Sequence, residues 1–199
     1  MKNPKRWETT SLFDFGQCKN GMNFRNGESG VSIHCLGVGD FQNHSTIRDT
    51  SLLPLINLDS EPDEGYLLKD DDILFVRSNG NKELVGRCVA VYPGTTRTVY
   101  SGFCIRFRQN EKSMATPFLL SVLKSDSIRK KMAGRGANIQ NLNQQLLASL
   151  LIPVPPKNLQ NEFAAFVEQL DKSKFSVSQQ QKMIDSCKRG IILHLTGRL

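Results

Sequence analysis

The sequence predicts an α+β fold, in which a mixed, β-rich domain over residues 1–156 is followed by a long coiled-coil-type helix over residues 157–199. Short β-rich runs between turn residues fill the first half of the chain. Helical patterns replace them after Thr116. The stretch Pro153-Val-Pro-Pro156 then interrupts regular structure, and a glycine-free segment with a seven-residue apolar repeat follows it. A chain of 199 residues, 39% hydrophobic, can bury one ordinary core without disulfides or metals.

The β-rich half contains several short apolar runs bounded by turn residues. Residues 7–15 alternate loosely and open the fold, and Val31–Leu36 reads as a strand that ends at two glycines. Asp72–Arg77 is a strongly apolar strand that leads into the turn-forming residues 78–81. Residues 84–92 are β-rich again and end at a Pro-Gly pair. This spacing predicts a mostly antiparallel arrangement.

The run Val99–Phe107 is expected to form one further strand. Alternation along it would place Phe103, Ile105 and Phe107 on one face. Cys104 and two arginines at positions 106 and 108 would then point to the other face. The sequence thus predicts a strand with one apolar face and one basic face.

The first predicted helix begins at Thr116-Pro117, which is typical of an N-cap followed by proline at the first helical position. The predicted helix continues to about Met132, with Phe118, Val122 and Ile128 near one face. A loop with two glycines follows, then a short helical stretch and an apolar run over residues 150–152. The prolines at 153–156 are taken as the domain boundary.

Beyond the boundary, an apolar residue recurs every seven positions, while the companion positions turn polar at Ser173 and Gln180. The pattern predicts one helix of about 30 to 36 residues. A helix with one apolar stripe needs a partner, from its own domain, another copy or another subunit. The proline hinge and the strict repeat favour an intermolecular coiled coil and a homodimer. The expected contact residues are Phe163, Leu170, Val177, Ile184 and Ile191.

Charge is unevenly distributed along the chain. Lysine and arginine number 26 against 19 acids, a formal net charge of +7. Residues 59–72 hold seven acids and one base, Lys69, so this segment carries −6 and the rest of the chain +13. Such a balance favours a polyanionic partner. No apolar run approaches the roughly 18 residues of a membrane span, and the N-terminus does not resemble a signal peptide, so we expect a cytoplasmic protein.

The sequence lacks the motifs of the common catalytic sites. Gly37-Val-Gly-Asp40 is only a GxG, without a third glycine. Asp70-Asp71-Asp72 is not followed by the acid-x-lysine pair of a metal-dependent nuclease, and no adenine-methyltransferase loop or GxSxG elbow occurs. Five cysteines form no CxxC pair, and neighbouring His34 and Cys35 would point to opposite faces of a strand. We therefore expect a binding module without a catalytic residue, cofactor or metal.

Two loops and one helix carry the candidate contacts to nucleic acid. Polar side chains in loops can read base edges, and basic side chains can neutralise phosphates. The alternative for each loop is a solvated turn, and Arg77 could instead pair with the acids at positions 70–72. The candidate DNA-binding residues are Arg77, Ser78, Asn79 and Lys82 in the first loop, Arg135, Asn138 and Gln140 in the second, and Lys130 and Lys131 on the helix.

Three stretches in this order resemble the specificity (S) subunit of type I restriction–modification enzymes. The first is Leu67–Gly80 with Glu83–Arg87, similar to a segment of the family's target-recognition domain. The second is Gly136–Asn143 followed by Leu150–Pro156, similar to the end of that domain. The third is the long helix after the double proline, which resembles the family's spacer helix. At 157–162 the sequence departs from the Glu-Gln-containing start of the family helix.

The resemblance implies a non-catalytic subunit that recognises a double-stranded DNA sequence. It also implies partner subunits, a methyltransferase (modification) subunit and a restriction/translocase subunit, which it directs to that sequence. A full S subunit has two recognition domains and two spacer helices, whereas this chain has one of each. A half-length form is expected to dimerise and recognise a target in two parts. Two alternatives remain: another nucleic-acid-binding protein with a dimerising helix, or a stand-alone nuclease fragment.

Overall fold

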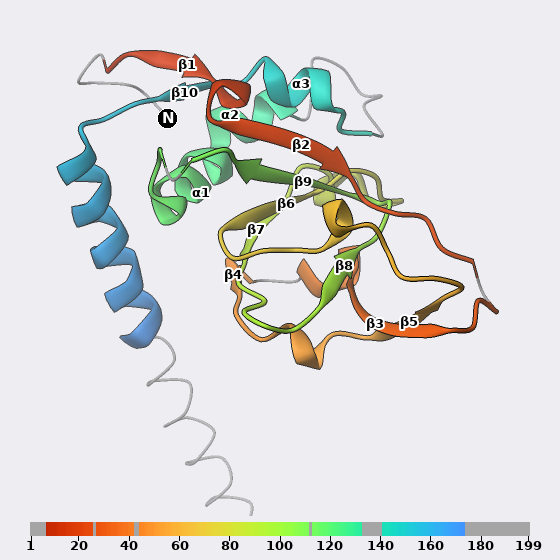
Figure 1. Ribbon diagram of the computed structural model, residues 1–199. Helices are drawn as coiled ribbons and strands as arrows, with labels where there is room; N and C mark the ends of the chain where they lie inside the picture. The colour runs from red at the N-terminus through yellow and green to blue at the C-terminus, as the bar shows by residue number, and fades with distance from the viewer. Residues whose placement is uncertain (1–6, 26, 42–43, 112, 133–140, 174–199) are drawn as a thin grey trace, which may run out of the picture.

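The computed structural model describes residues 7–25, 27–41, 44–111, 113–132 and 141–173, and a five-stranded sheet lies at its centre (Figure 1). The strands follow the order β2-β9-β6-β7-β4, and all neighbours are antiparallel except β4 and β7. Their bounds are β2 Gly16–Asn20, β9 Cys104–Gln109, β6 Asp72–Val76, β7 Cys88–Val91 and β4 Thr46–Ile47. The mixed, β-rich fold predicted from the sequence is confirmed.

Strand β6 is buried on both faces, which explains its unbroken apolar sequence. Ile73 and Phe75 point into the larger hydrophobic core, which contains the buried residues of the helices. Leu74 and Val76 point into a second core on the opposite face. Two helices, α1 (Thr116–Lys124) and α2 (Asp126–Met132), cover the first of these faces, and α3 (Gln144–Ala148) packs at the end of the same core.

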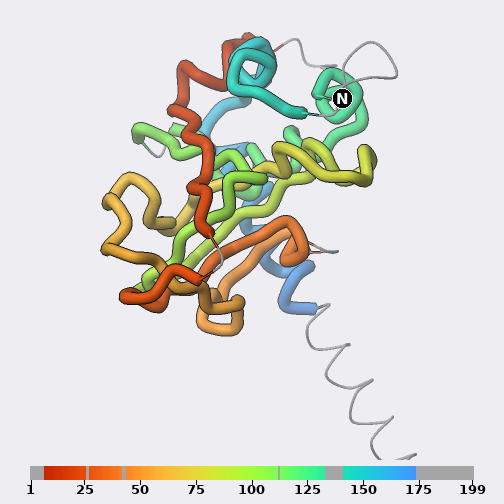
Figure 2. Tube along the Cα trace, turned by 90° about the vertical axis from the view of Figure 1, so that its right-hand side faces the viewer, coloured from red at the N-terminus to blue at the C-terminus, as the bar shows by residue number. Residues whose placement is uncertain are grey.

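A three-stranded sheet lies beside the second core, below the central sheet in Figures 1 and 2. Its order is β5-β3-β8, with β3 antiparallel to β5 and parallel to β8. The bounds are β5 Leu55–Leu58, β3 Val31–Leu36 and β8 Thr98–Tyr100. Short 3₁₀ helices connect the strands at Leu12–Asp14, Val38–Phe41, Thr50–Leu52, Glu64–Tyr66 and Lys82–Leu84.

A separate two-stranded sheet joins the beginning of the fold to its end. Strand β1 (Thr9–Ser11) pairs antiparallel with β10 (Leu151–Pro153), and the amide of Val154 donates to the carbonyl of Glu8 at 2.9 Å. Pro153 is tolerated because it is the last residue of a strand in a two-stranded sheet. The prolines at 155 and 156 therefore come shortly after the strand β10, which pairs the end of the fold with its beginning.

The prediction of one strand over Val99–Phe107 is wrong. The segment turns at Gly102 and divides into β8 and β9, which belong to different sheets. The amide of Gly102 donates to the carbonyl of Met22 at 2.7 Å, and a Cβ at position 102 would collide with the side chain of Asn23. The chain leaves one sheet at this turn and enters the other. Consequently Phe103 does not share a buried face with Ile105 but is 61% exposed.

The helix predicted from Thr116 to Met132 is interrupted at Ser125. This residue has an extended backbone, and its hydroxyl donates to the carbonyl of Val122 at 2.6 Å, which ends α1. The N-cap is Ala115 rather than Thr116, so Pro117 is the second residue of the helix and not, as predicted from the sequence, the first. The predicted apolar face remains, since Phe118, Val122 and Ile128 are all buried.

A C-terminal helix begins at residue 157 and is described to residue 173. Its first turns pack on the chain's own domain, beside α1 (Figure 1). Gln160 is buried, accepting from the amide of Ala115 at 3.0 Å and donating to the carbonyl of Pro155 at 2.9 Å. Phe163 packs edge-to-face on Phe118, with ring centroids 5.7 Å apart.

These contacts bear on the predicted coiled coil. Phe163, expected to contact a second copy, contacts its own domain, whereas Leu170 is 42% exposed. Val177, Ile184 and Ile191 lie outside the described residues, so the coiled coil stays a prediction. None of the helices in the described part of the chain is long and apolar enough to span a membrane.

Candidate nucleic-acid interface

The structure places residues 141 and 142, which follow the second predicted polar loop, against the first polar loop at the end of β6. Ser78 forms an isolated antiparallel bridge with Asn141, the residue that follows the second loop. Next to it, the amide of Leu142 donates to the carbonyl of Arg77 at 2.7 Å. Arg135, Asn138 and Gln140, predicted in the second loop, lie outside the described residues. The chain that leaves the second loop is nevertheless fixed against the first.

Arg77 has a structural contact that the sequence did not reveal. Its guanidinium donates to the carbonyl of Gly102 at 3.2 Å, and its amide donates to the carbonyl of Phe103 at 2.8 Å. Arg77 thereby holds the β8–β9 turn against the end of β6. The exposed ring of Phe103 consequently lies beside the first polar loop. The sequence prediction missed Phe103, although the glycine before it was a turn signal within the apolar run.

The suggested pairing of Arg77 with the acids at positions 70–72 is wrong. Asp72 is fully buried and forms a bidentate ion pair with Arg108, with both N–O distances at 2.7 Å. It also accepts from the amide of Lys69 at 2.8 Å. On the same face of β9, Arg106 donates to the carbonyl of Gly65 at 2.9 Å. Two strand arginines thus anchor the acidic segment, and they are unavailable to a nucleic acid.

The first loop is shaped by its own asparagines. The Oδ1 atom of Asn79 accepts from the amide of Asn81 at 2.8 Å. Asn81 in turn caps the 3₁₀ helix Lys82–Leu84 by accepting from the amide of Glu83 at 3.0 Å. Such turns fix the backbone locally and leave an asparagine's amide nitrogen as a donor. The loop can therefore present Asn79 to a base edge without first becoming ordered.

Helix α2 is attached to the segment that follows this loop. The Arg129 guanidinium donates to the carbonyls of Glu83 at 3.1 Å and Val85 at 3.2 Å. Lys130 and Lys131, the next two residues of α2, are exposed. The predicted positioning helix and the predicted reading loop therefore belong to one connected end of the domain (Figure 2).

The described part of the chain offers little for nucleophilic or metal chemistry. Burial raises the pKa of Cys18, Cys35 and Cys88 to about 12, so their thiols are protonated at neutral pH. His34 is engaged with the carbonyl of Leu53 at 2.9 Å. Within the described residues no group of three His, Cys, Asp or Glu side chains could hold a metal ion. The geometry of this end of the domain suits the binding of a polar, anionic surface.

Comparison with known proteins identifies the class. Residues 4–184 match the family model described as the type I restriction modification DNA specificity domain, and the chain therefore belongs to this family.

Two named relatives belong to type I restriction enzymes. A protein of Methanocaldococcus jannaschii, named provisionally as the MjaX specificity subunit, is 26% identical over 197 residues, which are 96% of this chain and 46% of that protein. The StySPI specificity subunit of Salmonella potsdam is 30% identical over 172 residues, which are 82% of this chain and 36% of that protein. The chain thus spans less than half the length of either relative.

The fold agrees with a solved structure of the same class. The HsdS subunit from Thermoanaerobacter tengcongensis has a TM-score of 0.60 to this chain at 15% sequence identity. The similarity covers 91% of this chain and 41% of that one. At this identity the comparison supports the shared fold, a sheet-rich domain followed by a helix.

Proposed function

We propose that the chain recognises a specific double-stranded DNA sequence as part of a type I restriction–modification system. It would direct a methyltransferase subunit and a restriction/translocase subunit to that sequence without itself catalysing a reaction. The observation that carries the proposal is the junction between the first polar loop and residues 141–142, through the Ser78–Asn141 bridge and the Leu142–Arg77 hydrogen bond. We expect the chain to act in the cytoplasm. DNA recognition by this chain would need no bound cofactor or metal.

The junction supports sequence reading for a physical reason. Sequence-specific contacts require polar side chains that are held in place, because an ordered loop loses less entropy on binding. Ser78 and Asn79 follow a buried strand, and Ser78 is tied to Asn141 at the end of that strand. Lys82, Lys130 and Lys131 are exposed nearby and suit the phosphate backbone. We assign the first two residues to base reading and the three lysines to positioning.

The exposed face of the C-terminal helix supports self-association. Leu159, Phe166 and Leu170 are 36%, 56% and 42% exposed. At 100° per residue these three positions fall on one narrow stripe, about 80 to 120° from Gln160, and the docked Phe163 lies between this stripe and Gln160. Val177, Ile184 and Ile191 continue the same sequence repeat. We infer that the stripe pairs with the helix of a second copy, which would give a homodimer.

Selection of bound duplexes from a random pool tests the proposed function. The wild-type chain should enrich a gapped motif, because two recognition domains would be separated by their helices. Asn79→Ala should change the preferred bases. Lys130→Gln with Lys131→Gln should weaken all duplexes alike and flatten the salt slope by up to about two units.

Three results would contradict this assignment. If both variants weakened every duplex equally, the division between reading and positioning residues would be wrong. If single-stranded RNA competed as well as duplex DNA, the alternative of another nucleic-acid-binding protein would be favoured. Turnover of DNA by the purified chain with Mg²⁺ and S-adenosylmethionine would contradict its non-catalytic role.

A further inference from the structure

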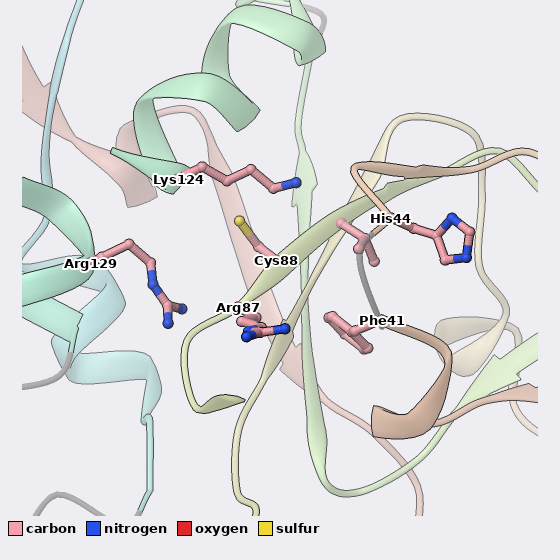
Figure 3. Close-up of a pocket in the computed structure, with 7 residues that line it drawn as sticks. Phe41, His44, Arg87, Cys88, Lys124 and Arg129 are labelled. Carbon is pink, nitrogen blue, oxygen red and sulfur yellow. The ribbon is translucent and has the colours of Figure 1, made fainter. Parts of the chain in front are cut away.

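A second basic site lies behind α2, in a pocket of about 280 Å³ between α1, α2, the beginning of β7 and the 3₁₀ helix at residues 38–41 (Figure 3). This volume is near the lower end of small-molecule sites, which are roughly 300–1,000 Å³. Figure 3 shows the cationic side chains arriving from separate elements around the sulfur of Cys88. The pocket is lined by Phe41, His44, Arg87, Cys88, Val89, Lys124 and Arg129.

The lining is strongly positive. Three of its side chains are permanent cations, a fourth is a histidine, and none of the seven is acidic. The Nζ atom of Lys124 donates to the hydroxyl of Ser45 at 2.9 Å, and Arg129 donates to two backbone carbonyls. These neutral partners fix the position of the two cations but do not cancel their charge. Cys88 does not cancel it either, because burial raises its pKa to about 12.

Two of the cations, Lys124 and Arg129, are less stable in their charged form than they would be in water. Burial lowers the pKa of Lys124 and of Arg129 from their usual values, and the charge of Arg87 lowers that of Arg129 further. Weaker opposite influences on the pKa of Lys124 come from Cys88 and then from Asp171, which lines the adjoining pocket together with Arg48. A bound anion would offset the cost of desolvation and reduce the mutual repulsion. Convergent, partly desolvated cations of this kind suit a tetrahedral oxyanion.

We propose that this pocket binds a phosphate group, supplied by the backbone of the bound duplex. The choice of source rests on the proposed function and on connectivity. Arg129 contacts residues 83 and 85, which directly follow the candidate reading loop, and Arg87 lies two residues further on. Lys130 follows Arg129 on α2. A backbone that runs past the loop and the exposed lysines would thus pass next to the pocket.

Thermal unfolding of the full chain in inorganic phosphate tests the pocket itself. At constant ionic strength, balanced with chloride, phosphate should raise the melting temperature of the wild-type chain. Lys124→Gln should lose this protection, and Lys124→Arg should retain it. Lys69→Gln removes the same charge from an exposed position among the acids and should behave as wild type. If Lys124→Gln melts too low for comparison, Arg87→Gln gives an independent reading.

The salt dependence of duplex binding tests the source of the phosphate. Lys124→Gln should flatten the logarithmic salt slope by about 0.9, the effect of one lost phosphate contact, and weaken binding about ten-fold. If phosphate protection is lost but the slope is unchanged, the assignment to duplex DNA is overturned in favour of a free phosphate ligand. If neither changes, the pocket proposal is overturned. A wild-type chain that binds no duplex would reject the proposed function, while the phosphate titration would still decide the pocket.

Discussion

Arg106 and Arg108 lie on one face of β9 and bind the acidic segment, residues 59–72. Arg108 binds Asp72 and also donates to the carbonyl of Leu67 at 2.9 Å, while Arg106 is 4% exposed. On β2, the Lys19 ammonium lies 3.9 Å from the centre of the Tyr66 ring. The basic residues of the chain therefore divide into a set that stabilises the fold and a set that remains at the surface.

The Asp72–Arg108 pair leads to a prediction about stability. Asp72→Ala should lower the free energy of unfolding by about 3 kcal/mol, because it leaves a largely buried guanidinium without its carboxylate. Asp70→Ala removes an exposed carboxylate that accepts from the amide of Gly94, and it should cost at most about 1 kcal/mol. Urea unfolding of both variants measures the difference. Equal losses of unfolding free energy would show that the buried ion pair contributes no more to stability than the exposed Asp70 contact.

The sequence predicted the location of the candidate loop but not the contact that each of its residues makes. The polar composition of residues 77–82 was sufficient to mark a candidate loop. The contact of Arg77 with the carbonyl of Gly102 was not, because it joins two turns that are distant in sequence. The exposure of Phe103 depends on the same contact, since alternation along a supposed single strand places the ring inside. Tertiary contacts therefore decide which side chains of a marked segment face outward.

At the scale of elements, local patterns located the strands better than their ends. Val31–Leu36 was predicted with the observed bounds, because alternation and the following glycines agree. The helix after Thr116 was predicted as continuous, whereas Ser125 caps α1 through its own hydroxyl. Strands β4 and β5 carried weak signals, and their pairing with distant strands defines them.

Two neighbouring aromatic residues of the C-terminal helix, Phe163 and Phe166, differ in their contacts and can be tested separately by mutation. Phe163→Ala should lower the free energy of unfolding by about 2 kcal/mol, because it removes a part-buried ring that packs on Phe118. Phe166→Ala should change it by less than about 0.5 kcal/mol, since that ring is 56% exposed. Unfolding at low protein concentration, where self-association is minimal, measures both. The reverse order would mean that the helix is not docked through Phe163.

At the scale of the whole molecule, two copies joined through their helices would form a symmetric assembly. If the helices pack antiparallel, the recognition domains lie at opposite ends and are related by two-fold symmetry. The DNA target should then be an interrupted palindrome. A specificity subunit with two different domains would instead read an asymmetric sequence.

Solution mass tests this assembly. The wild-type chain should show a concentration-dependent mass near the micromolar range by sedimentation. Phe166→Glu with Leu170→Glu should remain monomeric, because acids would be buried unpaired in the contact. Val177→Glu should act in the same way from its place in the repeat. Gln169→Glu adds one acid, as Val177→Glu does, at an exposed position off the stripe and should dimerise normally. A wild-type chain that stays monomeric at all concentrations would reject the homodimer.

The pairing of β1 with β10 has a consequence for how such domains can be exchanged. Because residues 9–11 lie beside residues 151–153, the polypeptide enters and leaves the domain at one place. A different domain with the same entry and exit, and with a surface that also receives Gln160 and Phe163, would replace this one without moving the helix that follows. Recombination between genes at these two positions would thus transfer a complete recognition domain. The sequence preference would change in one step, while the helix would keep the spacing between two such domains.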